Sequence, residues 1–295
     1  MEVVHRNTAP LLGLSCLAPE WKIKMKPKTR ARILESSLLP LLTFPYRLSL
    51  VFRQLGKSTM LSMRWLVRSK EFANFTYDLT EQNKSYLAHF VANICDISID
   101  DAVLYVREIE ENVHLRDYVT ARLKAHRRGN EIDGLAFYGR RAGWYALIRA
   151  SQPQIVVETG TEKGLGSLVI AEALKKNGKG KLITIDMEPS SGLLIGPEYS
   201  GLVERMIGDS LKCLISIDAI DLFIHDSDHS AAHEMAELNV VLSRLSANAI
   251  VLSDNSHVTA ELQRWAERNG RRFAYFAESP ANHWYKGAGI GVAYN

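Results

Sequence analysis

Ile155-Val-Val-Glu-Thr-Gly-Thr-Glu-Lys-Gly-Leu-Gly-Ser167 is the stretch of sequence that decides the fold. A short apolar run opens it, three glycines follow, and a helical pattern begins near Leu165. Glycines at a strand-to-helix turn let the backbone approach a ligand closely, and the free N–H groups of the helix start favour an anion. The stretch therefore predicts one strand-loop-helix unit with a ligand at its loop.

The same rhythm continues to the end of the chain, where short apolar runs alternate with helical patterns. We expect strands over residues 155–158, 182–186, 205–207, 222–225, 249–253, 273–276 and 290–294. Between the last two lies a loop-like segment instead of a helix, so the last strand should be antiparallel. The expected fold class is α/β, a Rossmann-like seven-stranded, mostly parallel sheet with an antiparallel last strand, preceded by an α-helical N-terminal region.

The chain divides by pattern into three parts. With 46% hydrophobic and 23% charged residues, wholesale disorder is excluded. Residues 1–70 are expected to form a basic arm and an amphipathic helical segment, residues 71–131 a helical subdomain, and residues 132–295 the α/β domain. Residues 38–67 mix leucines and aromatic residues with arginines, which predicts a basic amphipathic helix or helix pair.

Charge is unevenly distributed between these parts. Residues 20–70 hold twelve Lys or Arg against Glu20 and Glu35, a net charge of +10, whereas residues 71–295 hold 23 basic against 30 acidic residues, a net charge of −7. Such a basic segment suits an anionic membrane surface, a nucleic acid or an acidic partner, and the sign of the charge alone does not choose among them. A solvated tail, or packing of its apolar residues on the α/β domain, explains it as well.

The cysteines and the apolar runs bear on the compartment. Cys16, Cys95 and Cys213 are too few and too scattered for a disulfide framework or a metal site. No apolar run approaches a membrane span, and the start of the chain lacks the order of a secretory signal. We expect a cytoplasmic protein with peripheral membrane contact through residues 20–70 as an option, no specific nucleic-acid partner, and a homo-oligomer left open.

Acidic residues at strand ends narrow the choice of cofactor. The dinucleotide fingerprint is absent because Glu162 stands where its second glycine is needed. Asp186 ends the second strand, where a carboxylate can accept hydrogen bonds from both ribose hydroxyls, and Asp209 ends the third, within reach of an adenine amino group. Singly each is more often a loop or helix-cap residue, but together they indicate an adenosine-sized site.

With these residues the sequence resembles the class I S-adenosylmethionine-dependent methyltransferases over residues 132–295. It is similar in particular to metal-dependent O-methyltransferases of methyltransferase family 24 and to catechol, caffeoyl-CoA and macrolide-sugar methylating enzymes. The loop matches their pattern, except that Gly166 stands where serine is common. The resemblance implies cofactor binding by Glu158, Gly160, Thr161, Gly164, Ser167, Asp186, Asp209 and Ser210.

Carboxylates at the next two strand ends suggest a metal site. Asp226 follows the fourth strand, while Asp254 and Asn255 follow the fifth. The carboxyl ends of neighbouring parallel strands converge, and oxygen ligands suit a hard divalent cation such as Mg²⁺. The resemblance implies Asp226, Asp254 and Asn255 as metal ligands, with Asp228 as a substitute for Asp226. Capping of the following helices is the other reading of these residues.

A histidine supplies the candidate base. The catechol-type relatives place a lysine base three residues after the first metal ligand, and His229 occupies that position here. Histidine can act as a general base near neutral pH, so the resemblance implies His229 and Asp226 as catalytic residues. His257 is a second candidate, and His225 and His233 are expected to be structural.

The predicted function is an S-adenosylmethionine-dependent methyltransferase that acts on a hydroxyl of a small molecule, such as a sugar or polyketide, with a divalent metal. Two alternatives stay open at this point. One is a cephalosporin-hydroxylase-like enzyme on the same fold. The other is a non-catalytic binding module that acts through the basic N-terminal segment.

Overall fold

The computed structural model describes residues 35–37, 39–70, 76–126, 137–254 and 256–295, without the side chain of Leu42. The chain divides into two compact units, Met1–Lys57 and Ser58–Asn295. The second unit contains the α/β domain. The boundaries predicted near residues 70 and 131 stay predictions.

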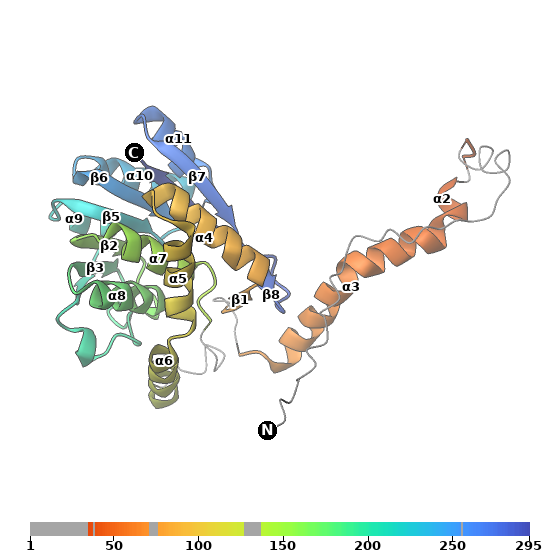
Figure 1. The fold of residues 1–295 in the computed structure, drawn as a ribbon, viewed down its shortest axis with the longest axis horizontal. Helices are drawn as coiled ribbons and strands as arrows, with labels where there is room; N and C mark the ends of the chain where they lie inside the picture. Colours follow the sequence, from red (N-terminus) through yellow and green to blue (C-terminus); the bar gives the residue numbers. More distant parts are fainter. Residues whose placement is uncertain (1–34, 38, 71–75, 127–136, 255) are drawn as a thin grey trace, which may run out of the picture. The chain divides into compact units, whose positions relative to one another are not determined.

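A seven-stranded sheet forms the centre of the second unit (Figure 1). Its strands are β2 (Ile155–Thr159), β3 (Lys181–Asp186), β4 (Val203–Ile207), β5 (Ile220–His225), β6 (Leu245–Ser253), β7 (Arg272–Ala277) and β9 (Gly289–Tyr294). They lie in the order β4-β3-β2-β5-β6-β9-β7. Strand β9 is antiparallel to both β6 and β7, and the other pairs are parallel. The predicted sheet and its reversed last strand are confirmed.

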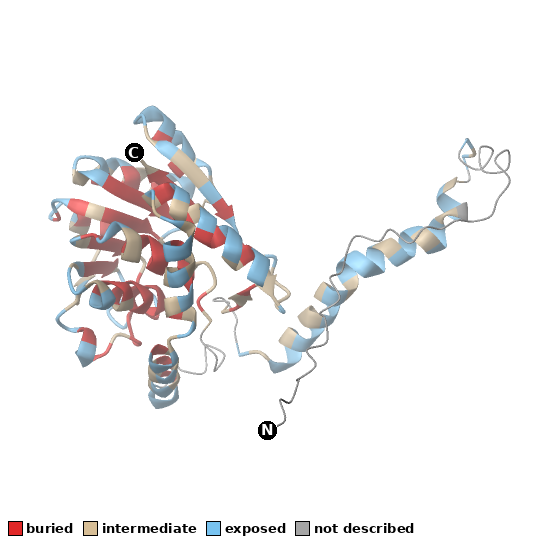
Figure 2. Ribbon diagram, in the orientation of Figure 1, coloured by how far each residue is buried: buried red, intermediate tan, exposed pale blue. Residues whose placement is uncertain are grey.

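Helices cover both faces of this sheet. On one face lie α7 (Arg141–Ser151) and α8 (Leu165–Asn177), and on the other α9 (Ser210–Leu214), α10 (Ala231–Leu242) and α11 (Glu261–Arg268). Neighbouring residues of β2 show the division, because Val156 packs in the first layer and Val157 in the second, and both are fully buried. A sheet buried on both faces needs continuous apolar strands, which is why the runs were visible in the sequence (Figure 2).

The helical region before the sheet consists of α4 (Glu81–Cys95), α5 (Ile99–Glu110) and α6 (Val113–Ala125). Each begins at a polar cap, Thr80, Ser98 or Asn112, whose side chain accepts a backbone N–H of the first turn. Helices α4 and α5 pack against α7. Val113 is exposed, because α5 ends before it and α6 starts there.

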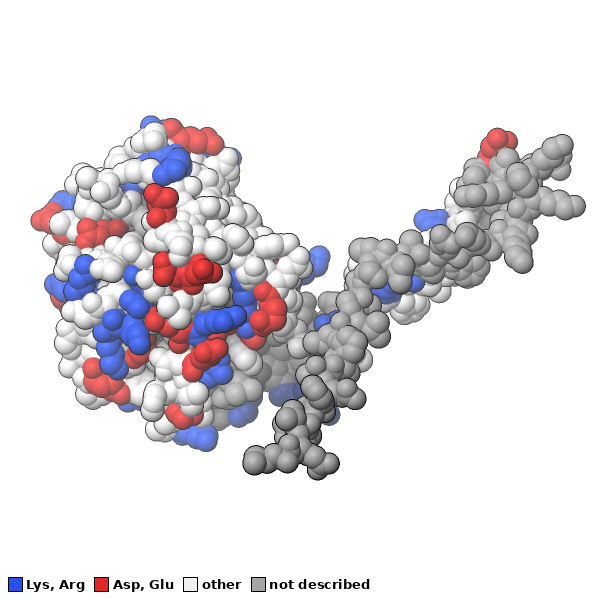
Figure 3. Space-filling model, in the orientation of Figure 1, with Lys and Arg blue, Asp and Glu red and all other residues white. Residues whose placement is uncertain are grey.

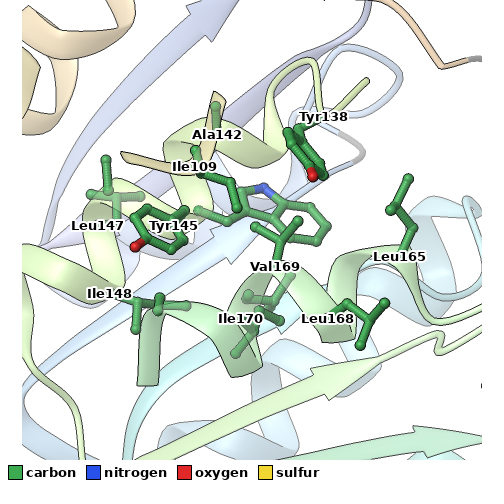
Figure 4. Packing of buried hydrophobic residues seen from close by; sticks show 14 of the residues in the cluster. Ile109, Tyr138, Ala142, Tyr145, Leu147, Ile148, Leu165, Leu168, Val169 and Ile170 are labelled. Atoms are coloured by element: carbon green, nitrogen blue, oxygen red, sulfur yellow. The ribbon is translucent and has the colours of Figure 1, made fainter. Parts of the chain in front are cut away.

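Figure 4 shows the core where α5, α7 and α8 meet, with Ile109, Tyr145, Leu168 and Val169 around one buried centre. Trp144 on α7 is fully buried in this cluster. The Trp144 ring leaves no room for a side chain at Gly166, in the first turn of α8.

Two small elements join the helical region to the end of the sheet. Strand β1 (Asp78–Leu79) pairs antiparallel with β8 (Pro280–Ala281), which lies in the connection between β7 and β9. The Asn83 side chain extends this contact, donating to the carbonyl of Ala277 (3.0 Å) and accepting from the N–H of Ser279 (2.8 Å). The connection that the sequence left as a loop is therefore held against α4.

The N-terminal part shows the predicted helix pair, α2 (Leu39–Leu42) and α3 (Phe44–Arg68). No residue of α3 is buried, and Figure 2 colours it as exposed and intermediate throughout. The basic arm expected before residue 35 lies outside the described residues. Among the helices of the described ranges, none is long and apolar enough to cross a membrane.

Candidate active site

A cavity of about 750 Å³ opens at the carboxyl ends of strands β2 to β6. It lies at the point where the strand order reverses between β2 and β5, the place where open α/β sheets bind ligands. Its walls include Gly160, Asp186, Asp209, Ser210, Asp226, His229 and Asp254 among the predicted site residues, and Tyr77, Arg140, Arg141, His257 and Tyr285 among the others.

Gly160 allows two strand-end loops to meet on this cavity. Its φ of 90° lies in the left-handed region, and a Cβ at this position would come within 2.1 Å of the carbonyl oxygen of Asp226. The Gly160 N–H donates to the carbonyl of Ile185 (2.9 Å), which ties the loop to β3. A side chain here would push the loop after β2 away from the loop after β5.

Beneath the loop lies a buried cluster of polar side chains. The Glu158 carboxylate accepts hydrogen bonds from the hydroxyls of Ser167 and Thr184, and Thr184 lies 2.6 Å from the hydroxyl of Thr161. Burial raises the pKa of Glu158 to about 7. The described cavity wall does not include Glu158, Thr161, Ser167 or Gly164, which caps the start of α8. They support the loop from below, and their direct contact with a cofactor stays a prediction.

The two acidic strand ends on the cofactor side serve the backbone and the cavity together. Asp186 accepts from the N–H groups of Glu162 and Glu188 (both 2.8 Å), and Asp209 caps α9 by accepting from Leu211 N–H (2.9 Å). Both residues also line the cavity. Because each carboxylate oxygen accepts more than one hydrogen bond, the cap role leaves acceptor capacity for a ligand.

Ser210 belongs to a network centred on Glu237 of α10, a residue that the sequence did not mark. The buried Glu237 carboxylate is contacted by Ser210 Oγ, Thr159 Oγ1 (2.7 Å), Ser227 Oγ (2.9 Å), His225 Nδ1 (2.7 Å) and His233 Nε2 (2.9 Å). Burial alone would raise the pKa of Glu237, but the hydrogen bond and charge of His225, together with the hydroxyls of Ser210 and Thr159, lower it to about 2. The network joins β2, β5, α9 and α10 under the cavity and fits the structural roles expected for both histidines.

Arg140, just before α7, is the most consequential site residue that sequence reasoning missed. Its guanidinium contacts both carboxylate oxygens of Asp254 through Nε and Nη2. Its Nη1 lies 3.2 Å from Glu278, and its backbone N–H donates to the same carboxylate (2.7 Å). The Tyr77 hydroxyl also donates to Glu278 (2.8 Å). No spacing in the sequence connects residue 140 with residues 254 and 278.

Asp226 and Asp254 lie together at the ends of β5 and β6, across β2 from Asp186 and Asp209. We call this part of the cavity the acceptor side. Burial raises the pKa of Asp226 well above its ordinary value, and the charge of Asp254 acts in the same direction. Burial would also raise the pKa of Asp254, but Arg140 outweighs it and lowers that pKa to about 2. The arginine therefore holds Asp254 in its charged form.

Of the predicted metal ligands, Asp226 and Asp254 lie in the cavity wall, and their role as ligands stays a prediction. Both oxygens of Asp254 are engaged by Arg140, and Asn255 lies outside the described residues. Within the described ranges, no group of three or more His, Cys, Asp or Glu residues is arranged to hold a metal. Asp228, the predicted substitute, accepts from the N–H of Ser230 (2.8 Å), which lowers its pKa. The positive charge beside Asp254 comes from a side chain.

Two histidines face the cavity as candidate bases. His229 is exposed and lies four residues after the end of β5. His257 is also exposed, with its Nδ1 3.2 Å from the carbonyl oxygen of Asp254, and partial burial lowers its pKa. The structure thus brings both predicted base candidates to the acceptor side.

Comparison with known proteins adds one family. Residues 157–256 match the model of a family described as a methyltransferase domain. The match spans the loop after β2 and the carboxyl ends of strands β3 to β6, which together build the cavity. A search of curated proteins found no match.

Solved structures of three methyltransferases are similar to part of the chain. A methyltransferase from Geobacter sulfurreducens shares 23% identity over 61% of this chain and 90% of its own, with a TM-score of 0.46. The O-methyltransferase TomG from Streptomyces achromogenes, in complex with SAM, shares 22% over 60% and 89%, with a TM-score of 0.45. The SAH-bound methyltransferase PaMTH1 from Podospora anserina shares 12% over 75% and 98%, with a TM-score of 0.45.

Proposed function

We propose that this chain, of which residues 157–256 match a family described as a methyltransferase domain, transfers a methyl group from S-adenosylmethionine to a hydroxyl of a small molecule. The family match supports the reaction class. The residues that line the cavity support the assignment of the methyl donor and of the acceptor.

The charge of the cavity wall carries the assignment of the donor. Six acidic residues line the cavity, Glu162, Asp186, Asp209, Asp226, Asp228 and Asp254, against two basic ones, Arg140 and Arg141. Arg140 offsets the charge of Asp254 and the raised pKa of Asp226 favours its uncharged form, so the negative charge of the wall comes mainly from Glu162, Asp186, Asp209 and Asp228. This charge attracts the sulfonium cation of S-adenosylmethionine and repels the diphosphate of a dinucleotide. Asp186 would accept from the ribose hydroxyls and Asp209 from the adenine amino group, since both carboxylates line the cavity.

The acceptor would lie on the opposite wall, near Arg140, His229, His257 and Tyr285. Methyl transfer is a direct displacement in which the C–O bond forms as the C–S bond breaks, and S-adenosylhomocysteine leaves with the electron pair. The hydroxyl proton passes to His229. The protein contributes by holding the two reactants in line and by taking this proton.

Magnesium has no step in this mechanism, because Arg140 already engages both oxygens of Asp254. The guanidinium compensates the charge of the carboxylates on the acceptor side and keeps Asp254 in place. A hydroxyl acceptor is favoured because histidine and carboxylate side chains surround the acceptor position and can receive its proton.

Isothermal titration of the full chain with S-adenosylmethionine tests the donor. We expect binding, and at least a tenfold loss of affinity for Asp186→Ala, because hydrogen bonds to a charged group contribute roughly 1.5–3 kcal/mol. Asp218→Ala is a matched control, since Asp218 is exposed and pairs only with Arg244 among the described contacts. Absence of binding by the unmodified chain would overturn the proposal.

A screen of hydroxyl acceptors with methyl-labelled donor tests the transfer. His229→Gln should reduce transfer at least a hundredfold, the usual lower contribution of a general base, while cofactor affinity stays unchanged. Consumption of the acceptor without transfer of label would show that the domain performs a different reaction.

A further inference from the structure

We propose that helix α3 (Phe44–Arg68) binds the surface of an anionic phospholipid membrane through one apolar face, with its basic residues on the other side. The proposal concerns the helix itself and is independent of the methyl-transfer function. It rests on the exposure, spacing and charge of described residues of α3.

An apolar face runs along the helix. Phe44, Leu48, Val51 and Leu55 recur at intervals of three or four residues, and Leu66 extends the same face three residues C-terminal to Met63 and three turns beyond Leu55. Phe44 is 57% exposed, Val51 51% and Leu66 67%, and Phe52 beside them is 65% exposed. We call Phe44, Leu48, Val51, Phe52, Leu55, Met63 and Leu66 the apolar face. Exposed apolar surface of this kind, densest between Phe44 and Leu55, marks an interaction site.

The basic residues occupy the opposite side. Arg53, Lys57 and Arg68 each follow a residue of the apolar face by two positions. Two positions correspond to about 200° around an α-helix, so these charges point away from the apolar face. Arg64 lies four positions before Arg68 and shares their side. The helix therefore places these four basic residues opposite the apolar face, on a side that also carries the exposed Met60 and Val67.

The charge of the helix selects the partner. Arg47 adds a fifth basic residue, and Phe44–Arg68 contains no Asp or Glu. On the side seen in Figure 3, the described part of this helix shows Lys and Arg and no acidic residue. Helices with a Lys- and Arg-rich polar face and Leu or Phe on the other lie in the membrane interface, and anionic lipids attract the basic residues.

A second copy of the helix is a poorer complement. Pairing through the apolar face would bring together two helices with five positive charges each and no acidic residue to offset them. The polar residues Thr59 and Ser62 would also interrupt the seam, because they lie between Leu55 and Leu66 on the same side. In an anionic bilayer the apolar face lies toward the acyl chains and the anionic headgroups attract the basic residues, whereas a second copy would cover only the apolar face.

Flotation of the full chain with phosphatidylcholine vesicles, with and without phosphatidylserine, tests the proposal. We expect the protein to float with the anionic vesicles, to bind neutral vesicles much more weakly, and to be released as salt is raised. Arg53→Gln with Lys57→Gln should lower the affinity roughly twentyfold to thirtyfold, since each basic residue near the surface contributes about fivefold.

A charge-matched pair of variants isolates the apolar face. Val51→Asp with Phe52→Asp places two carboxylates on that face, whereas Ser49→Asp with Gln54→Asp adds the same charge at exposed polar positions of the same helix. The first variant should lose binding to anionic vesicles to a far greater degree than the second. Circular dichroism and S-adenosylhomocysteine affinity should stay the same in both.

Three results would overturn the proposal. The unmodified chain could fail to float with anionic vesicles while remaining folded. The two aspartate variants could lose binding equally, which would leave the apolar face without a role. Sedimentation could show a dimer that Val51→Asp with Phe52→Asp dissolves, in which case a second copy covers this face.

Discussion

Arg140 compensates two buried carboxylates at once. Asp254 is 1% exposed and the Glu278 side chain is fully buried, and both carboxylates contact the same guanidinium. Burial of charged groups is costly unless they are paired, so the stability of the fold around Asp254 and Glu278 depends on Arg140. The bidentate geometry also fixes the direction in which Asp254 faces the cavity.

Replacement of Arg140 should therefore destabilise the whole domain. We expect Arg140→Ala to lower the free energy of unfolding by about 3–5 kcal/mol, the usual cost of leaving a buried charge without its partner. Arg140→Lys should recover part of this loss, because an ammonium keeps the charge but cannot contact both oxygens of Asp254. Urea unfolding at pH 7 measures both values.

Arg264→Ala is the control for that series. Arg264 is 62% exposed and pairs with Glu261 one turn away on α11. Exposed pairs contribute about 0–1 kcal/mol, so this variant should remain close to the unmodified protein. Equal losses in Arg140→Ala and Arg264→Ala would contradict the role assigned to Arg140.

Gly166, in the first turn of α8, shows how core packing determines which residue stands at a position. A Cβ at this position would lie 2.8 Å from the ring of Trp144 and 2.7 Å from the Glu158 carboxylate. Trp144 and Glu158 are both buried, so neither can move away cheaply. This contact explains why glycine stands where the resembling family commonly has serine.

Gly166→Ala should consequently destabilise the protein by about 1–3 kcal/mol, the usual cost of overpacking. Gly201→Ala is the matched control, because a Cβ there would meet no heavy atom within 4 Å. Thermal unfolding of the two variants compares them. A Gly166→Ala midpoint equal to that of Gly201→Ala would show that the core accommodates the methyl group.

At the scale of elements, the strands could be predicted because their burial on both faces of the sheet appears directly in the sequence as an apolar run. Val156 and Val157 are neighbours that pack into different layers, so a strand buried on both faces reads as an uninterrupted apolar run. The carboxyl ends of these runs locate the cavity, which is why Asp186, Asp209 and Asp226 could be placed there in advance.

The supporting contacts could not be predicted in the same way. Arg140 reaches Asp254 across 114 positions of sequence, and Glu237 reaches Thr159 across 78. Such pairs depend on how helices settle on the sheet, and no local period encodes that. Likewise β1 and β8 contain two residues each, too few to show an alternating pattern.

The Glu237 network predicts a pH dependence for the elements that it joins. The folded-state pKa of about 2 lies below the ordinary value of a glutamate, so the network's contribution is fully present above about pH 4.5 and is lost as the pH falls toward 2. We expect Glu237→Gln to be less stable than the unmodified protein at pH 7 by on the order of 3 kcal/mol. The difference should shrink between pH 4.5 and 3.

Denaturant unfolding at several pH values measures this difference. Glu204→Gln is the comparison, because the Glu204 side chain is 56% exposed and its ion pair with Lys181 lies on the surface. Its effect should stay below about 1 kcal/mol at each pH. A Glu237→Gln difference that is constant down to pH 3 would contradict the depressed pKa.

At the scale of the whole molecule, the net charge of +3 conceals two regions of opposite sign. The +10 of residues 20–70 includes the basic side of α3, and the −7 of residues 71–295 includes the acidic wall of the cavity. One region suits an anionic surface and the other a cationic cofactor. Salt screens the exposed charges on α3 and screens the buried pairs around the cavity much less. Raising the salt concentration should therefore weaken vesicle binding and leave cofactor binding nearly unchanged.

Removal of metal ions tests whether the reaction of the whole enzyme depends on the arginine or on an ion. We expect the full chain to retain cofactor binding and methyl transfer after dialysis against EDTA, since Arg140 supplies the positive charge at Asp254. Loss of transfer that Mg²⁺ restores would show instead that Arg140 releases Asp254 during turnover.

Arg140→Ala makes this test sharper, because it removes the guanidinium and leaves Asp226 and Asp254 facing the same cavity. Two neighbouring carboxylates without a cation are the oxygen ligands that Mg²⁺ prefers, and an ion that binds only the folded state raises its stability. Mg²⁺ should therefore raise the unfolding midpoint of Arg140→Ala and leave that of the unmodified chain unchanged. If both respond equally, the ion binds elsewhere. If neither responds, the strand ends lack a further ligand, and the arginine is then the cation that these two carboxylates require.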